Sequence, residues 1–294
     1  MDEEILNSYK KAGKIAAEAL AYGKELIKKD AKVLDICNKV EEKIIGLGGE
    51  IAFPSQISLN ETAAHFCPED KEGLILTDQI VSLDVGVHID GCIGDNACSV
   101  DLSGNNSDLI KASKEALKAA IETVKVGVKL SDIGKAIEET IKSYGFQPVR
   151  NLSGHGLDHY NIHCYPTIPN FDTQQPEVLE KCVIAIEPFA TDGIGLIHEK
   201  GEPTVFTLMG KKSARVGFVR NIQKQLESYK GLPFTTRWIT KNFSEAQVRF
   251  ALNQFKQLGI LKEYPPLVEK QNGLVSQAEH SLLVDDEVIV LTKI

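Results

Sequence analysis

Five ionisable residues, spread over nearly two hundred positions, each lie at the centre of an apolar or glycine-rich stretch. They are Asp84 in I-V-S-L-D-V-G-V, Asp95 in C-I-G-D-N-A-C, His155 in S-G-H-G-L, Glu187 in V-I-A-I-E-P-F and Glu279 in V-S-Q-A-E-H-S-L-L-V. A carboxylate in a buried strand is costly unless a cation neutralises it, and these stretches contain no Lys or Arg. For any single acid, pairing with a Lys or Arg elsewhere in the chain is the alternative. The five together favour a hard, oxygen-rich site for two divalent metal ions.

The spacing of Asp84 and Asp95 predicts that the two carboxylates lie close together. Between them stands Asp90-Gly91, a strong signal for a two-residue type I′ hairpin turn. With that turn, Asp84 pairs with Ala97, which lies two residues from Asp95 on the same face of the sheet. The acids are then diagonal neighbours on adjacent strands, with their backbone positions roughly 7 Å apart in space. Such a pair repels unless a positive charge intervenes, and two bridged metals roughly 3.5–4 Å apart fit the gap.

Other polar residues stand where they could face a cleft that contains this metal site. Glycines flank His155, so the backbone can turn sharply and leave the imidazole room to reach a ligand. The segment Asn161-Ile162-His163 is typical of a strand that directs His163 to this cleft. Pro188 cannot donate to a strand ladder, so it marks a strand end at Glu187. His65 follows small residues in a loop, which suits a group that reaches substrate.

The composition indicates a globular protein of a reducing compartment. A chain of 294 residues with 43% hydrophobic content can bury a large core. Its first residues, M-D-E-E-I-L-N-S-Y-K-K, lack the apolar core of a signal peptide, and no later apolar run approaches membrane-spanning length. The six cysteines form no C-x-x-C pair, which is typical of reduced thiols. We therefore expect a cytoplasmic protein with no membrane segment and no thiolate zinc site.

Helical and strand-like patterns alternate along the chain. Helices are predicted over 5–29, 34–47, 107–126 and 131–143, and strand-rich sections over 51–102, 147–207, 274–284 and 288–291. The order of helices, strands, helices and strands predicts an α+β fold and indicates two related halves.

Residues 210–264 differ from the rest of the chain. They show helical periodicity, few strand signals, and eleven Lys or Arg against three acids, a local balance of +8 in a chain of net charge −8. One interpretation is contact with an acidic partner such as ribosomal RNA. The other, which we favour because the charges are dispersed, is a solvated helical face. The chain returns to strands after this segment and brings Glu279 to Asp84.

The ordered motifs resemble those of the type 2 methionine aminopeptidases, in an archaeal-like form with a short N-terminus. The matching pieces are A-F-P-S-Q-I-S-L-N-E-T-A-A-H, the Asp84 and Asp95 pair, S-G-H-G-L-D-H-Y-N-I-H, I-A-I-E-P-F, E-Y-P-P-L and Q-A-E-H. The resemblance implies the pseudo-symmetric pita-bread fold of the M24 metallopeptidases. Its catalytic domain would comprise 1–209 and 265–294, and 210–264 would be the helical insertion subdomain of type 2 enzymes.

The same resemblance assigns roles to the metal ligands. Asp84 would chelate one metal, Asp95 and Glu279 would bridge both metals, and His155 with Glu187 would complete the second. Oxygen-rich ligands with one imidazole fit Co, Mn, Fe or Zn.

The resemblance also implies a substrate site. Catalytic and substrate contacts would come from His65, His163 and Glu187, with Phe53, Ile162 and Tyr264 around the methionine side chain. Segment 199–209 departs from some relatives, so we assign it no pocket residues.

The implied reaction removes initiator methionine from peptides and nascent proteins when the second residue is small, by a hydroxide held between two metals. Two alternatives remain. One is a proline-specific metallopeptidase, because the wider fold family shares the five ligands. The other is a catalytically silent homologue that binds RNA or nascent chains through the basic insertion. We expect a monomer that contacts the ribosome, if at all, through that insertion.

Overall fold

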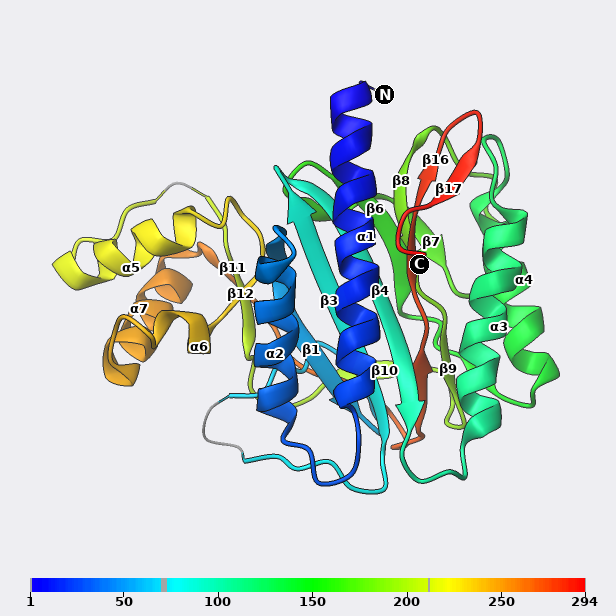
Figure 1. The fold of residues 1–294 in the computed structure, drawn as a ribbon, viewed down its shortest axis with the longest axis horizontal. Coiled ribbons are helices and arrows are strands. Elements are labelled where there is room, and N and C mark those ends of the chain that lie inside the picture. The colour runs from blue at the N-terminus through cyan, green and yellow to red at the C-terminus, as the bar shows by residue number, and fades with distance from the viewer. Residues whose placement is uncertain (1, 70–72, 211, 294) are drawn as a thin grey trace.

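Two halves lie side by side, each a pair of helices packed over an antiparallel sheet (Figure 1). The computed structural model describes residues 2–69, 73–210 and 212–293. Mixed helix and sheet confirm the α+β prediction, and the repeated helix and strand order corresponds to the two halves.

The first half contains α1 (Glu3–Leu26) and α2 (Val33–Gly46), which cover one face of a three-stranded sheet. The strand order is β1 (Glu50–Leu59), β3 (Ile80–Ile89) and β4 (Cys92–Asp101). Apolar side chains of the two helices pack against β1 and β3 in one core cluster. Most of β3 is buried because α1 covers one of its faces and the segment of β15 (Val275–Gln277) contacts the other.

The second half contains α3 (Ser107–Thr123) and α4 (Leu130–Ser143), packed on a five-stranded sheet. Its strands, in spatial order, are β17 (Val288–Val290), β16 (His280–Val284), β8 (Cys182–Ile186), β6 (Ser153–Asp158) and β7 (Asn161–Pro169). In α4, apolar side chains recur at helical spacing and meet strand residues in the core of this half. The four predicted helices are confirmed, with ends that differ by a few residues.

Two small antiparallel sheets join segments far apart in the sequence. One has the order β10 (Ile197–Glu199), β14 (Leu267–Glu269) and β2 (Thr62–Ala64). The other has the order β15 (Val275–Gln277), β9 (Phe189–Thr191) and β5 (Gln147–Pro148). Because β2 and β14 pair, the chain after the insertion is fixed against the first half.

The residues from Val205 to Tyr264, which lie between β10 and β14 in the sequence, form a separate lobe at the left of Figure 1. It contains β11 (Val205–Leu208), α5 (Gly217–Glu227), β12 (Phe234–Thr235), α6 (Thr236–Ile239), α7 (Glu245–Leu258) and β13 (Leu261–Tyr264). These elements share a hydrophobic core. The strands β12 and β13 both pair with β11. The sequence of this segment contained few strand signals, so these two strands were not predicted. Lys211, one of the basic residues of this segment, lies outside the described residues.

The predicted β3–β4 hairpin is confirmed in its register. Asp84 pairs with Ala97, and Asp95 stands opposite Gly86. Asp90 and Gly91 at the turn have φ values of 48° and 87°, as a type I′ turn requires. All six cysteines are free thiols, as predicted. In the described ranges, no helix combines the length and apolarity needed to cross a membrane.

Candidate metal centre

All ten residues singled out in the sequence line a single cleft of about 810 Å³. Strands of both halves and β13 of the lobe form its walls. The residues are Phe53, His65, Asp84, Asp95, His155, Ile162, His163, Glu187, Tyr264 and Glu279. The structure therefore brings together side chains that the sequence spreads from β1 to the start of β16.

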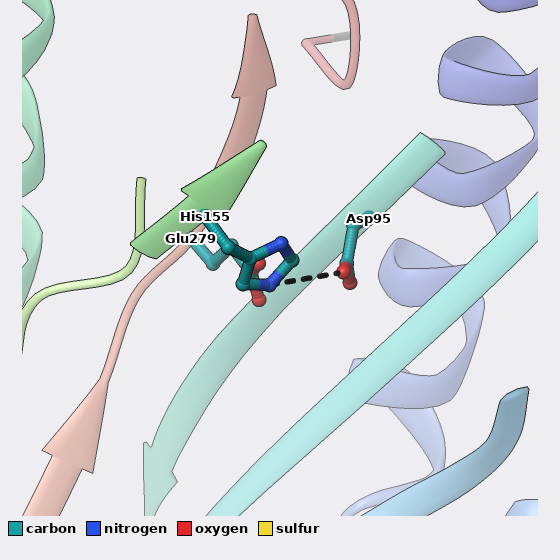
Figure 2. A group of neighbouring side chains, drawn as sticks. All are labelled: Asp95, His155 and Glu279. Carbon is teal, nitrogen blue, oxygen red and sulfur yellow. Dashed lines mark ion pairs between the residues drawn. The ribbon is translucent and has the colours of Figure 1, made fainter. Parts of the chain in front are cut away.

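Asp95, His155 and Glu279 form a tight group in this cleft. One ligand atom from each lies within 4.8 Å of the others, and Figure 2 shows the three side chains converging. His155 Nε2 lies 3.9 Å from Asp95 Oδ2. The three come from β4, from β6 and from the residue just before β16, so both halves of the molecule contribute.

Backbone contacts hold these strands in place. The Glu279 amide donates to the carbonyl oxygen of Ala97 at 3.0 Å. Two residues further on, the Ser281 hydroxyl accepts from the Asp95 amide at 2.8 Å and donates to the Asp95 carbonyl at 2.7 Å. These buried bonds fix the segment 279–281 against β4, so the two carboxylates keep their relative position.

Glu187 and Asp84 border the tight group on its other sides. Glu187 directly follows β8, where Pro188 ends the strand as predicted, and its Oε1 lies 3.6 Å from His155 Nε2. Asp84 lies on β3, diagonal to Asp95 across the hairpin. Within the described chain, one oxygen each of Asp84 and Asp95 is buried without a hydrogen-bond partner.

The electrostatics of the site show a shortage of positive charge. Burial raises the pKa of Asp84 to about 7. For Asp95, burial and then the charges of Asp84 and Glu187 raise the pKa well above its usual range. The pKa values of Glu187 and Glu279 are raised in the same way, by burial first and then by neighbouring carboxylates. Burial also lowers the pKa of His155 to about 4, so the imidazole is neutral at pH 7.

These donors fit divalent metal ions. Four carboxylates and one neutral imidazole offer hard oxygen and nitrogen ligands, and the four negative charges equal the charge of two divalent cations. The unpartnered oxygens of Asp84 and Asp95 supply lone pairs that metals could occupy. The residues present are therefore chemically suited to the group that the sequence predicted.

Two further histidines face this centre. Burial lowers the pKa of His65 to about 4, and its ring packs edge-on against Tyr264 with centroids 5.4 Å apart. His65 also has φ 65°, a left-handed conformation that is uncommon outside glycine and often found at functional sites. Burial, followed by the charges of His155 and His65, lowers the pKa of His163 to about 2. The His163 ring lies 4.5 Å from that of His155.

Apolar side chains line the neighbouring wall. Phe53 on β1 and Ile162 on β7 are both nearly buried, with 5% and 6% of their surface exposed. Gly86 stands opposite Phe53 in the sheet, and a Cβ there would lie 2.1 Å from the Phe53 ring. The glycine thus makes room for the aromatic ring beside Asp95.

Sequence reasoning did not assign a role to Gln277, which contacts two of the carboxylates. Its Nε2 donates to Glu187 Oε2 at 3.2 Å and to Glu279 Oε2 at 3.5 Å. The backbone N–H of Gln277 donates to Ser99 Oγ at 2.7 Å. Its position two residues before Glu279 in Q-A-E-H was the available signal, because residues two apart in an extended strand share a face. Gln56, His198 and Lys262 also line the cleft.

Comparisons with known proteins identify the relatives of this chain. The family described as Metallopeptidase family M24 matches residues 7–220. A methionine aminopeptidase of Archaeoglobus fulgidus is 44% identical over 295 residues, covering 99% of both chains. Among solved structures, a methionine aminopeptidase from Thermotoga maritima aligns with TM-score 0.73 and 24% identity over 100% of this chain and 98% of that one. Prolidase from Pyrococcus furiosus aligns with TM-score 0.62 and 18% identity, over 100% of this chain and 65% of that one.

The two structural likenesses establish the fold, which is the pita-bread architecture expected from the motifs. The family match over most of the chain and the relative of nearly equal length establish more than the fold. The chain belongs to metallopeptidase family M24, and within it to the methionine aminopeptidases.

Proposed function

We propose that this chain removes the N-terminal methionine from peptides and proteins whose second residue is small, using two divalent metal ions. The observation that carries the proposal is the convergence of four carboxylates, two buried and two half-buried, and one imidazole on a cleft that also contains an apolar wall. The identity of 44% to a named methionine aminopeptidase supports the choice of substrate.

Five residues would hold the metals. Asp84 would ligate one ion, Asp95 and Glu279 would be shared, and His155 with Glu187 would complete the second. The distances of 3.9 Å and 3.6 Å from His155 Nε2 to Asp95 and Glu187 support a common ion for these three. When bound, such ions lower the pKa of a water molecule and polarise the scissile carbonyl group. Co, Mn, Fe and Zn all suit this ligand set.

The protein's own side chains would supply proton transfer and orientation. Glu187 borders the centre and can accept a proton as well as bind metal. His65 and His163 are neutral at pH 7, so each can donate one N–H to the oxygen of the tetrahedral intermediate. Gln277 donates to both Glu187 and Glu279, which would hold the two carboxylates in their binding orientation.

The methionine side chain would lie against Phe53, Ile162 and Tyr264. An apolar slot accepts the flexible and polarisable thioether readily. Tyr264 borders this slot from the lobe, where its hydroxyl accepts from Thr207 Oγ1 at 3.4 Å. The walls of the cleft on the lobe side would restrict the second residue.

The location and partners belong to the same proposal. We propose a cytoplasmic monomer that acts on nascent chains. Lys212, Arg215 and Arg220 are exposed on the lobe, where they could contact ribosomal RNA. Neither rival function has a specific observation in its favour. The likeness to a prolidase is one of fold, and all five ligands are present, which a silent homologue would not need.

Peptide hydrolysis tests the proposal directly. Protein treated with a chelator should be inactive and should recover hydrolysis of Met-Ala-Ser when a divalent metal is added back. Ala-Pro substrates should be hydrolysed far more slowly. Preferential cleavage of Ala-Pro, or metal-independent turnover, would refute the proposed function.

A further inference from the structure

A bulge in β1 turns two side chains toward the cleft. Phe53 stands opposite Gly86 and Gln56 stands opposite Asp84. Between these two pairs, β1 advances by three positions while β3 advances by two. In a regular strand, residues three apart point to opposite faces, and one extra residue restores them to the same face. Phe53 and Gln56 accordingly both line the cleft.

The side-chain carbonyl of Gln56 has an unused acceptor at this position. Gln56 is 6% exposed, and its Oε1 is buried without a hydrogen-bond partner in the described structure. Directly opposite residues in an antiparallel pair have neighbouring side chains, so Gln56 lies beside Asp84. Asp84 Oδ1 is likewise buried without a partner. Two acceptors therefore lie next to each other at one end of the cleft, and burying them unpaired lowers stability.

We propose that Gln56 Oε1 accepts a hydrogen bond from the free α-amino group of the substrate. This inference rests on the proposed function and adds a residue that selects for a free N-terminus. An amino group carries several N–H donors on one nitrogen, so it can satisfy Gln56 and Asp84 together. The methionine side chain then extends toward Phe53, which the same bulge places on that face. A ligand without the amino group leaves the carbonyl unpaired.

A purely structural role for Gln56 makes opposite predictions. A side chain that stabilises the fold through its own hydrogen bonds lowers the melting temperature when an apolar group replaces it. If the Gln56 carbonyl is instead paired only when substrate is bound, its replacement does not lower the melting temperature, because a buried unpaired polar atom is removed. Gln56→Met tests this difference, since methionine has nearly the same length and shape as glutamine.

Ser55→Ala is the matched control. Ser55 is the neighbouring residue of the same strand, it is fully buried, and its hydroxyl also lacks a partner among the described residues. It does not line the cleft, and its amide donates to Glu41 at 3.1 Å, an interaction that alanine retains. Ser55→Ala should therefore leave the KM for Met-Ala-Ser unchanged.

The experiment measures kinetics, ligand affinity and melting temperature on the full chain. In metal-reconstituted Gln56→Met, KM for Met-Ala-Ser should rise about tenfold, the scale of one lost hydrogen bond. The kcat should change by less than about twofold, because the bond exists in both the bound substrate and the transition state. The melting temperature of the metal-free variant should equal or exceed that of the wild type. Gln56→Asn, which withdraws the carbonyl, should shift KM in the same direction by less.

Two ligands isolate the amino group. By calorimetric titration, Gln56→Met should weaken L-methioninol about tenfold and leave 4-(methylthio)butan-1-ol, which lacks the amine, nearly unchanged. Equal losses for both ligands, an unchanged KM, or a lowered melting temperature would overturn the role of Gln56. The wild type could fail to hydrolyse Met-Ala-Ser while Gln56→Met still weakened only the ligand that carries the amine. That result would refute the proposed function but support the amine site.

Discussion

The Glu41 contact and the cleft both bury carboxylates, and they differ in what neutralises them. Glu41 on α2 is 5% exposed and is ion-paired with Arg237 of α6, which is equally buried. In the cleft, Asp95 and Glu279 are 3% and 2% exposed, yet within residues 2–69, 73–210 and 212–293 no Lys or Arg forms an ion pair with them. His155 Nε2 lies 3.9 Å from Asp95 Oδ2, but the imidazole is neutral at pH 7 and supplies no positive charge.

The hydrogen bonds of the two places differ in the same way. Glu41 accepts from both terminal nitrogens of Arg237, from Trp238 Nε1 at 2.9 Å and from the Ser55 amide at 3.1 Å. Its charge is fully satisfied by the chain, and the contact fixes the lobe to α2. Asp84 and Asp95 each retain an oxygen without a partner in the described structure. The difference indicates that the first site is complete in the protein alone, whereas the second requires cations from outside.

The largest effect is expected at Asp95 and Glu279, the proposed shared ligands. Asp95→Asn and Glu279→Gln should each reduce hydrolysis of Met-Ala-Ser to background, because a neutral amide does not hold two cations together. The metal-free variants should be at least as stable as the wild type, since one of four mutually repelling carboxylates is lost. Glu180→Gln, at an exposed position before β8, is the control. Near wild-type turnover with saturating metal would disprove the bridging roles.

Glu41→Gln should produce the opposite pattern. Removing one partner of a buried ion pair leaves Arg237 uncompensated, which costs about 3–5 kcal/mol in the free energy of unfolding. Turnover per folded molecule should change little, because Glu41 does not line the cleft. Denaturant unfolding measures the loss, with Glu42→Gln at the exposed neighbouring position as control. Equal stability of Glu41→Gln and Glu42→Gln would show that the pair contributes nothing to the attachment of the lobe.

His65 provides a third kind of polar group, half-buried, neutral and outside the proposed ligand set. His65→Ala should lower kcat by roughly 10²-fold, the scale for a lost proton donor or acceptor in the transition state. Metal content, measured by elemental analysis, should stay at the wild-type value. Loss of metal in this variant would instead make His65 a ligand.

The pH dependence of stability distinguishes the two sites without any mutation. Because the pKa values of the cleft carboxyls are raised, the folded metal-free protein at pH 7 retains protons that the unfolded chain has released. Near pH 6.5 the buried histidines, whose folded pKa values are lowered, are half protonated only in the unfolded chain and oppose this effect; above about pH 7.5 they are nearly neutral in both states. Stability of the metal-free protein should therefore fall as pH rises from about 7.5 to 8, by up to about 1.4 kcal/mol per pH unit for each retained proton.

Divalent metal should remove this slope, because it binds the deprotonated carboxylates and replaces the protons. Denaturant unfolding with chelator and with metal, at several pH values, measures both profiles. A metal-free protein whose stability is constant or increases over this range would contradict the charge shortage of the cleft.

The comparison also explains what the sequence could predict. The β3–β4 register followed from the turn residues Asp90 and Gly91, because a two-residue hairpin leaves little freedom of pairing. The candidate ligand positions were visible because acids in apolar strands are costly, and the family resemblance then implied their roles. Both signals are local in the chain, or depend on motifs that can be compared one by one.

The features that were missed depend on contacts between distant segments. Glu41 and Arg237 are 196 positions apart, on a helix and a lobe whose relative placement no local pattern specifies. The bulge that aims Gln56 into the cleft is likewise a property of how β1 pairs with β3. β12 and β13 were underestimated because their strand partner β11 lies outside the segment whose periodicity indicated helices.

The smallest effect is expected from charges that are neither buried nor paired in the core. Lys212, Arg215 and Arg220 are exposed on the lobe, and they do not line the cleft. Replacing all three with Gln should leave kcat/KM for a short Met-Ala peptide nearly unchanged, because exposed charges are screened and interact weakly with a distant site. If these residues contact the ribosome, the same variant should bind it more weakly and with a shallower salt dependence, since each phosphate contact releases counterions. A large loss of peptide turnover would show that the lobe's basic surface acts in the cleft, and the division between buried ligands and solvated charges would fail.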